Sequence, residues 1–244
     1  MINPCIIIPV YNHEKPLAEI LARLADHGLP CILVDDGSDA ACAKAIDDLA
    51  SGRPWIEAIR HQYNRGKGGA VKTALLAAQA RGYSHALQLD ADGQHDLNDV
   101  AKFLETARAH PQAVVIGSPK FDASVPKGRY YARYLTHVWV WINTLSFAIP
   151  DAMCGFRVYP VGPCADLIQR RQLDERMAFD VEILIRLYSQ GLEFVPLPTR
   201  VGYPKDGISY FRLWEDNLRL SLMQARFFLS LPIRLPALLA RRFR

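Results

Sequence analysis

Two carboxylates one residue apart follow a short apolar run in the first half of the chain. Asp90 and Asp92 come directly after Ala86-Leu87-Gln88-Leu89, and Gln94 is two residues further on. Mg or Mn takes oxygen ligands and can bind a diphosphate at the same time. We therefore predict a metal site at Asp90, Asp92 and Gln94 that holds the diphosphate of a nucleotide. Spacing alone does not separate this site from a solvated loop or a helix cap, so the rest of the sequence must supply the context.

Two further polar segments supply that context. Asp35-Asp36-Gly37-Ser38 follows an apolar run, and Asn64-Arg65-Gly66-Lys67-Gly68-Gly69-Ala70 opens a long helical stretch. Glycines let the backbone approach a ligand closely, while cations and a helix N-terminus favour phosphate. We predict a nucleotide site here. The glycine run is neither a Walker A sequence nor a dinucleotide fingerprint after the first strand, which argues against kinases, P-loop hydrolases and dehydrogenases.

The elements that must position these residues alternate between strands and helices up to about residue 117. A continuous apolar run at 5–10 is typical of a strand buried on both faces of a parallel sheet. Such alternation predicts an α/β fold with a mostly parallel sheet flanked by helices and with its chemistry at the carboxyl ends of the strands. Further strands are expected at 32–34, near 55–59, at 86–89 and at 113–116, with helices between them, among them 67–81 and about 97–109.

The pattern changes after Gly117. We expect a loop, an aromatic-rich helix through about Phe147, a short segment at 155–159 and a helix over about 179–189. This divides one domain, 1–210, into a donor half (1–117) and an acceptor half (118–210). The remaining segment, 211–244, is predicted to form amphipathic helices broken at Pro232 and Pro236.

Charge and cysteine content suggest where the protein acts. Five cysteines make an odd count with no CxxC pair, which predicts a reducing, cytoplasmic location. The chain carries a net charge of +4, yet residues 211–244 alone hold seven arginines and two acids. Apolar residues interleave with these arginines, so we predict that the tail binds an anionic membrane surface, peripherally, on the inner face of the cytoplasmic membrane. No spanning helix and no nucleic-acid partner are expected, because Leu135–Ile149 is short and interrupted and the body has no second basic patch.

Several motifs in a fixed order resemble glycosyltransferase family 2, and within it the dolichyl-phosphate mannose synthase-like branch, over residues 4 to about 200. The resemblance implies the GT-A fold, a nucleotide-diphosphate sugar donor of the UDP or GDP type, Mg or Mn, and inversion at the anomeric carbon. The motifs are Pro9-Val10-Tyr11-Asn12-His13-Glu14, Val34-Asp35-Asp36-Gly37-Ser38, Asn64-Arg65-Gly66-Lys67-Gly68, Asp90-Ala91-Asp92-Gly93-Gln94-His95, Gly117-Ser118, Asp151 with Cys154-Gly155-Phe156-Arg157, and Phe179-Asp180-Val181-Glu182.

The resemblance also places residues around the donor. The predicted nucleotide-sugar site comprises Pro9, Tyr11, Asn12, Glu14, Asp35, Asp36, Arg65, Lys67, Asp90 and Ala91. Two stretches depart from the branch. Ser118-Pro119-Lys120 lacks the Arg common after Gly-Ser, and Tyr203-Pro204-Lys205-Asp206-Gly207 replaces an Arg-x-Gly-x-Ser-Lys pattern, so the acceptor is less determined than the donor.

The acceptor decides whether a base is needed. A lipid phosphate needs none, whereas a hydroxyl would need a carboxylate to take its proton. Asp180 is the first candidate base, with Asp151 and Glu182 behind it; each could equally be a structural carboxylate. Arg157 and Lys205 are candidates for binding an acceptor or donor phosphate.

The acceptor itself has two interpretations. The wider branch implies polyprenyl phosphate. Residues 206–212 instead resemble small family 2 enzymes that accompany bacterial aryl-polyene or fatty-acid-like biosynthesis, which would imply a polyene or lipid hydroxyl.

Two other functions would need features that differ from those of this sequence. A nucleotidylyltransferase should carry a glycine-rich loop with Arg directly after its first strand, where this chain has Pro9-Val10-Tyr11-Asn12. A non-catalytic nucleotide-binding membrane scaffold should have lost its carboxylate pair or its donor loop, and both are intact. A lipid-directed glycosyltransferase remains the prediction.

Overall fold

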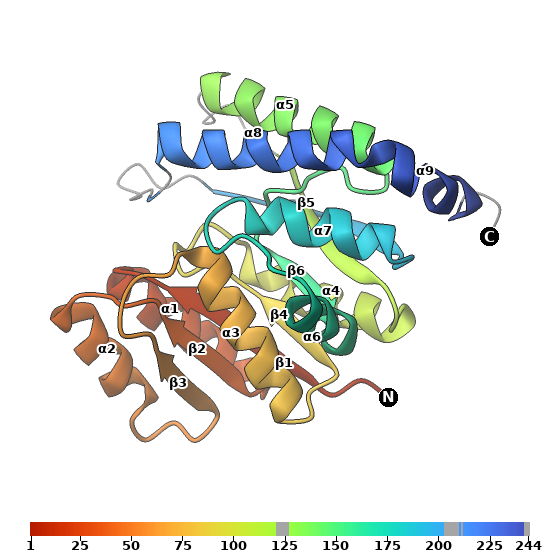
Figure 1. Cartoon of the computed structure of the whole chain (residues 1–244). Helices are drawn as coiled ribbons and strands as arrows, with labels where there is room; N and C mark the ends of the chain where they lie inside the picture. The colour runs from red at the N-terminus through yellow and green to blue at the C-terminus, as the bar shows by residue number, and fades with distance from the viewer. Residues whose placement is uncertain (121–126, 203–209, 211, 242–244) are drawn as a thin grey trace.

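The computed structural model describes residues 1–120, 127–202, 210 and 212–241. Its centre is a seven-stranded sheet in the order β3-β2-β1-β4-β6-β5-β7 (Figure 1). The strands are β1 (Pro4–Val10), β2 (Cys31–Asp35), β3 (Ile56–Arg60), β4 (His85–Gln88), β5 (Val114–Lys120), β6 (Arg157–Pro160) and β7 (Phe194–Arg200). The pairs β1–β2, β2–β3, β1–β4 and β5–β7 are parallel, and β6 runs antiparallel to both β4 and β5. The predicted α/β fold with a mostly parallel sheet is confirmed.

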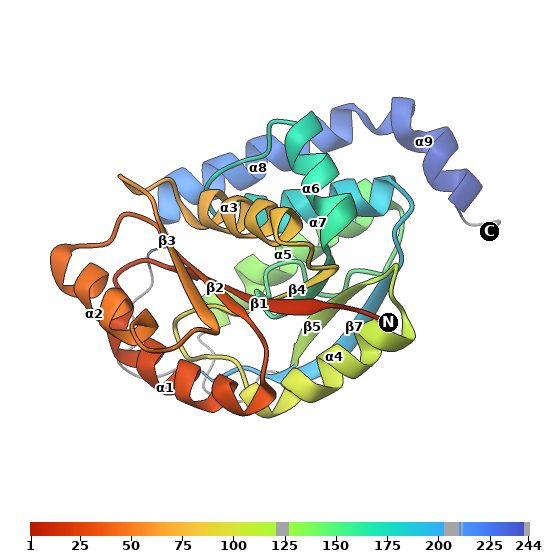
Figure 2. The same ribbon diagram turned by 90° about the horizontal axis from the view of Figure 1, so that it is seen from below.

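Helices cover both faces of the sheet (Figure 2), so the central strands β1, β2, β4 and β6 are buried on two sides, whereas the edge strands β3 and β7 are partly exposed. In β1, Ile6 and Ile8 face α1 and α4, whereas Cys5 and Ile7 face α3. This explains the continuous apolar run, because both faces of the strand need apolar side chains. The helices are α1 (Glu14–Leu24), α2 (Ala40–Ala50), α3 (Lys67–Ala80), α4 (Val100–Ala109), α5 (Lys127–Thr144), α6 (Val161–Arg170), α7 (Phe179–Ser189), α8 (Leu213–Leu229) and α9 (Leu231–Ala240).

The second half of the chain completes the sheet and adds an outer helical layer. β6 inserts between β4 and β5, and β7 adds to the edge beside β5; β7 and α6 were not predicted from the sequence. Helices α5 and α8 lie side by side at the top of the molecule in Figure 1, with α7 between α8 and the sheet. Residues before and after 117 therefore contribute strands to a single sheet.

The tail differs from its prediction in two respects. The break between α8 and α9 falls at Ser230; Pro232 lies in the first turn of α9, where a missing N–H costs little, and Pro236 lies inside that helix. Two of its arginines turn inward. Arg234 donates to the carbonyl oxygens of Asn143 and Phe227 at 3.1 and 2.7 Å, and Arg241 donates to that of Tyr188 at 2.6 Å.

Among the described helices, none is by itself long and apolar enough to cross a membrane. Taken together, α8 and α9 pass that test of length and composition as a pair bent by 70°.

Candidate active site

The predicted donor residues converge because parallel strands end at one edge of the sheet. The turn after β2 carries Asp35 and Asp36, and the turn after β4 carries Asp90 and Asp92. The glycine-rich start of α3 follows β3 at the same edge. Residues far apart in the sequence thus come together at the carboxyl ends of the strands, as expected for this class of fold.

Asp36 holds the glycine-rich loop before α3 in shape through hydrogen bonds to its backbone. It is 2 % exposed, and its carboxylate accepts hydrogen bonds from the backbone N–H groups of Arg65 and Gly66 at 2.9 and 2.7 Å. Its Oδ1 is also 2.8 Å from His61 Nδ1. Gly66 has a φ of +98°, and a Cβ there would lie 2.5 Å from the carbonyl oxygen of Glu175, so only glycine fits this turn.

Asp35 is likewise bonded within the protein. Its Oδ1 accepts from the N–H of Ser38 at 2.9 Å, and its Oδ2 accepts from Arg60 Nε at 2.7 Å. Arg65 is paired with Glu175 at 2.7 Å. In this structure these predicted nucleotide residues fix the loop's shape, and their contact with a nucleotide stays a prediction.

Lys67 joins the two halves of the site. Its ammonium lies 2.8 Å from Asp90 Oδ1 and 2.8 Å from Asp180 Oδ2, and its side chain is 17 % exposed. Burial would lower the pKa of Lys67, but the charges of Asp180 and Asp90 raise it well above its usual range. Lys67 is therefore a permanent cation that holds together Asp90, a predicted metal ligand, and Asp180, the first candidate base.

Asp90 is confined by the chain that faces it. A Cβ on Gly155 would come within 2.2 Å of Asp90 Oδ2, so this glycine makes room for the carboxylate. His95 Nε2 lies 3.4 Å from the same oxygen. Burial would raise the pKa of Asp90, but Lys67 and His95 hold it well below its usual range, so the carboxylate is ionised.

Unlike Asp90, which is paired with Lys67, Asp92 accepts a hydrogen bond from a backbone N–H group. Its Oδ1 accepts only a backbone hydrogen bond, from Gln94 at 3.0 Å, among the contacts found in the described part of the chain. Burial and the negative charge of Asp90 raise its pKa, and a nearby dication would reverse that effect. Across the residues that the structure describes, no group of three or more His, Cys, Asp or Glu side chains forms a full metal cage. Two carboxylates fit Mg or Mn when a substrate diphosphate completes the coordination.

The first strand's turn forms another wall of the site. Asn12 has a φ of +49°, and its Oδ1 accepts from the N–H of Asp39 at 2.9 Å, which ties this turn to the one after β2. Tyr11 packs edge to face against Tyr210, with ring centroids 4.9 Å apart. Pro9 lies near the end of β1 and Glu14 begins α1, both partly buried, and Ala91 is buried in the turn after β4.

The part of the chain predicted to bind the acceptor contains a cavity of about 190 Å³ beside Asp151. Arg133 donates hydrogen bonds of 2.7 Å to both carboxylate oxygens of Asp151, and His137 Nε2 lies 3.4 Å from the same carboxylate. Burial would raise the pKa of Asp151, but His137 and Arg133 hold it well below its usual range. The cavity is lined by Ser118, Pro119, Arg133, Tyr134, His137, Trp141, Pro150 and Asp151.

The other predicted acceptor residues are bound within the fold. Arg157 is fully buried and donates to the carbonyl oxygens of Cys154, Asp180 and Ala152 and to Tyr159 Oη, so the structure does not present it to a phosphate. Glu182 bridges Arg186 and the N–H of Asp174. Lys205 lies outside the described residues.

Sequence reasoning missed Arg133, His137 and His95. Arg133 lies in the run Arg129-Tyr130-Tyr131-Ala132-Arg133-Tyr134, and cations between aromatic residues on one helix are the signal that could have singled it out. His95 directly follows the predicted metal turn. His137 lies four residues after Arg133 on the same helix, and in the sequence it is marked only as an interruption of the apolar stretch Leu135–Ile149.

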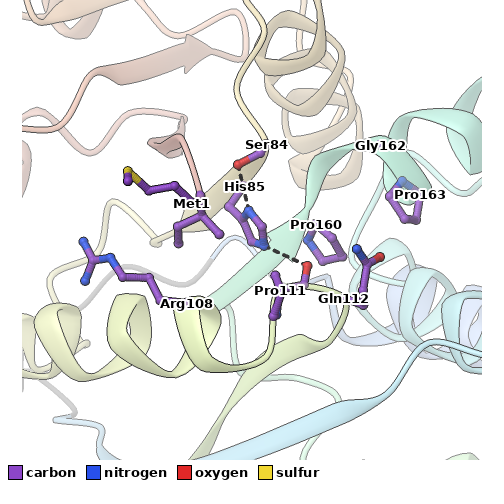
Figure 3. A pocket seen from close by; sticks show the side chains of 10 residues that line it. Met1, Ser84, His85, Arg108, Pro111, Gln112, Pro160, Gly162 and Pro163 are labelled. Atoms are coloured by element: carbon purple, nitrogen blue, oxygen red, sulfur yellow. Dashed lines mark hydrogen bonds between the residues drawn. The ribbon is translucent and has the colours of Figure 1, made fainter.

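A larger cavity, of about 460 Å³, lies at the opposite edge of the sheet (Figure 3). There His85 bonds to Ser84 Oγ and to the carbonyl oxygen of Pro111, at 2.9 and 3.0 Å. Its lining also includes Met1, Arg108, Gln112 and Pro160, and it lies at the amino end of β4, whereas Asp90 follows the carboxyl end. This cavity does not belong to the candidate active site.

The sheet order, the carboxylate pair after β4 and the glycine-rich start of α3 define a glycosyltransferase of the GT-A fold. The chain belongs to glycosyl transferase family 2, whose model matches residues 5–175. The resemblance drawn from the sequence motifs is confirmed.

Two relatives are similar to this chain in sequence, and two solved structures are similar to it in fold. The chain is 33 % identical over 171 residues to the UDP-N-acetylglucosamine–dolichyl-phosphate N-acetylglucosaminyltransferase of Methanococcus voltae, covering 63 % of this chain and 68 % of that one. It is 26 % identical to the polyprenol monophosphomannose synthase of Mycolicibacterium smegmatis, covering 90 % and 84 %.

In fold it matches the glucosyl-3-phosphoglycerate synthase of Mycobacterium tuberculosis with a TM-score of 0.62 and 14 % identity, covering 98 % and 80 %. It matches a mannosyltransferase of Pyrobaculum calidifontis in complex with GDP-Man and Mn²⁺ with a TM-score of 0.57 and 15 % identity, covering 98 % and 74 %.

Proposed function

We propose that this glycosyltransferase moves a hexose, with inversion, from a nucleotide-diphosphate sugar to a polyprenyl phosphate. It acts at the cytoplasmic membrane face, where residues 211–244 contribute to membrane association. One observation carries the choice of a phosphate acceptor over a hydroxyl. Each of the three candidate bases is already paired with a cation: Asp180 with Lys67, Asp151 with Arg133, and Glu182 with Arg186.

A hydroxyl acceptor would need one of these carboxylates to receive its proton. Asp180 would first have to give up its 2.8 Å contact with Lys67, which is buried beside it. A phosphate is ionised at neutral pH, so its oxygen can attack the anomeric carbon without losing a proton. The new carbon–oxygen bond forms as the bond to the nucleotide diphosphate breaks, and the departing diphosphate keeps the electron pair.

The donor side is proposed to work through Asp92 and Asp90, which would hold Mg or Mn. When bound, such an ion supplies positive charge to the leaving diphosphate. The backbone loop shaped by Asp36, with the N-terminus of α3, faces the same region and would bind phosphate oxygens. The Mn²⁺ and GDP-Man named for the Pyrobaculum mannosyltransferase support this assignment.

The acceptor phosphate is proposed to bind in the 190 Å³ cavity at Arg133. Asp151 orients the guanidinium at the cavity wall, and Ser118 and His137 line the same space. A guanidinium has five N–H donors in a fixed fork that matches phosphate geometry. The dolichyl-phosphate and polyprenol acceptors named for two relatives support a lipid phosphate here.

Two alternatives fit less well. Removing charged groups from water costs free energy even when they are paired. A scaffold without activity would therefore gain nothing from keeping the buried Lys67–Asp90–Asp180 cluster. A nucleotidylyltransferase is disfavoured by membership of family 2.

The test is transfer from a panel of UDP-, GDP- and dTDP-sugars with Mg or Mn to a polyprenyl phosphate, compared with the matching polyprenol. We expect metal-dependent release of the nucleotide diphosphate with the phosphate acceptor and none with the alcohol. Asp92→Asn should abolish transfer, whereas Asp96→Asn, on the same turn, should retain it. Transfer to the alcohol would overturn the phosphate assignment, and absence of any turnover with intact nucleotide binding would favour the scaffold.

A further inference from the structure

Helices α5 and α8 expose rows of large apolar side chains to solvent. Trp214, Leu218 and Leu222 are 90, 60 and 51 % exposed, and Leu135 on α5 is 61 % exposed. Spacing of three or four residues puts the members of each row on one side of their helix. We call the exposed apolar residues of these two rows the α5–α8 face. They are Tyr131, Leu135 and Ile142 on α5 and Trp214, Leu218, Leu222 and Leu229 on α8.

The two rows form one surface because the helices pack against each other between them. Trp139 of α5 meets Phe228 of α8 edge to face, with ring centroids 5.8 Å apart. Asn143 Nδ2 donates to Gln224 Oε1 at 2.7 Å. Figure 1 shows α5 and α8 side by side as the outermost layer of the molecule.

The α5–α8 face is separate from the apolar residues that hold α8 to the protein. Leu220, Met223 and Phe227 lie on another side of α8 and belong to the buried core. The helix therefore presents two apolar sides, one packed and one in solvent. A contiguous exposed apolar surface of this kind marks an interaction site, because leaving it in water is unfavourable.

The charge pattern around the face fits an anionic lipid surface. Residues 127–144 and 217–241 contain no Asp or Glu. Arg219 and Arg226 are exposed along the edge of the outward row of α8, and Arg219 also lies 3.2 Å from Asp174. The two acids of α8, Glu215 and Asp216, lie in its first turn, where Glu215 is paired with Arg212. Tryptophan, tyrosine and leucine flanked by cations suit the boundary between headgroups and acyl chains.

The acceptor cavity lies next to this face. Tyr134 and Trp141 line the cavity from α5, on the side that borders the exposed row of Leu135 and Ile142. Phe147, 78 % exposed, packs on Trp141 with ring centroids 5.2 Å apart. A lipid whose chain stays in the bilayer could thus bring its headgroup to Arg133 from the side.

We propose that the α5–α8 face docks on an anionic bilayer and sets the acceptor cavity at the headgroup level. The inference rests on the proposed function for its acceptor, and it adds α5 to a membrane contact otherwise assigned to the tail. A tail acting alone would bind membranes regardless of changes on α5. The part played by α5 is what the experiment must isolate.

The experiment measures flotation of the full chain with vesicles of phosphatidylcholine containing phosphatidylglycerol. Leu135→Glu tests α5, and Leu218→Glu with Leu222→Glu tests α8. The controls lie on exposed positions of α4, on the other side of the sheet: Ala101→Glu matches the charge of Leu135→Glu, and Ala101→Glu with Ala109→Glu matches that of the α8 pair. We expect each leucine replacement to weaken vesicle binding about tenfold, as lost apolar burial predicts, with unchanged melting temperature and nucleotide binding.

Transfer assays separate this inference from the proposed function. If both hold, Leu135→Glu loses turnover on polyprenyl phosphate in vesicles but retains it on a short-chain, water-soluble polyprenyl phosphate. Vesicle binding without transfer to either acceptor would leave the face intact and refute the function. Normal vesicle binding by Leu135→Glu would overturn the inference, as would a dimer in solution that the same replacement dissociates.

Discussion

Replacing Lys67 by methionine should destabilise the protein strongly at neutral pH. The change keeps the length of the side chain and removes its ammonium, which lies 2.8 Å from both Asp90 and Asp180. The side chains of Asp90 and Asp180 are only 20 and 7 % exposed, and the replacement leaves both carboxylates without their shared cation. Breaking a buried ion pair by removing one partner costs about 3–5 kcal/mol, so we expect the free energy of unfolding to fall by about 3 kcal/mol.

The loss should depend on pH in a defined direction. In the native chain the pKa of Asp90 is depressed, so its contribution is present above its unfolded pKa of about 4 and is lost as pH falls through the folded value. Without Lys67, burial would raise the pKa of Asp90. Ionisation of this carboxylate would then lower the free energy of unfolding as the pH rises through that raised value. The difference between native and variant should thus be largest near pH 7 and shrink as the pH falls to about 4.

Urea unfolding followed by tryptophan fluorescence at several pH values measures this difference. Lys102→Met, on an exposed position of α4, serves as the control and should change stability by less than about 0.5 kcal/mol. Adding Asp180→Asn to Lys67→Met should recover part of the loss, because one uncompensated charge is removed. A loss below about 1 kcal/mol, or a loss that grows on acidification, would refute the assigned role of Lys67.

Three further predictions concern the site. Gly155→Ala should lower kcat about 100-fold, because a Cβ 2.2 Å from Asp90 Oδ2 must displace that carboxylate, whereas Gly162→Ala, with nothing within 4 Å, should be neutral in the same assay. Asp36→Ala should leave two backbone N–H groups without their acceptor, lowering the free energy of unfolding by about 3 kcal/mol in urea titrations and weakening nucleotide binding; native-like binding would contradict its role in the loop. Arg133→Lys should raise the KM for a soluble polyprenyl phosphate about tenfold while donor binding measured by calorimetry is unchanged, and equal effects on both would argue for a purely structural arginine.

Local sequence was sufficient for the donor half because its signals are local. An apolar run such as 5–10, bounded by polar segments, is typical of a strand covered on both faces, and a polar turn after each parallel strand lies at the carboxyl edge of the sheet. Glycines at 66 and 68 mark close approach of backbone, and the structure finds Glu175 and Phe179 in contact distance of them. Class, fold and family followed from these patterns.

Tertiary structure alone decided which charges meet. Lys67 and Asp180 are 113 positions apart, and their contact depends on α7 packing against the start of α3. Arg133 meets Asp151 only because α5 folds back over the loop that leads into β6. Sequence spacing carries no information about such pairings, since a side chain's electrostatic partner is set by the packing of elements that are distant along the chain. The same packing determined which tail residues are core and which face solvent, a distinction that amphipathic periodicity on a helix with two apolar sides does not make.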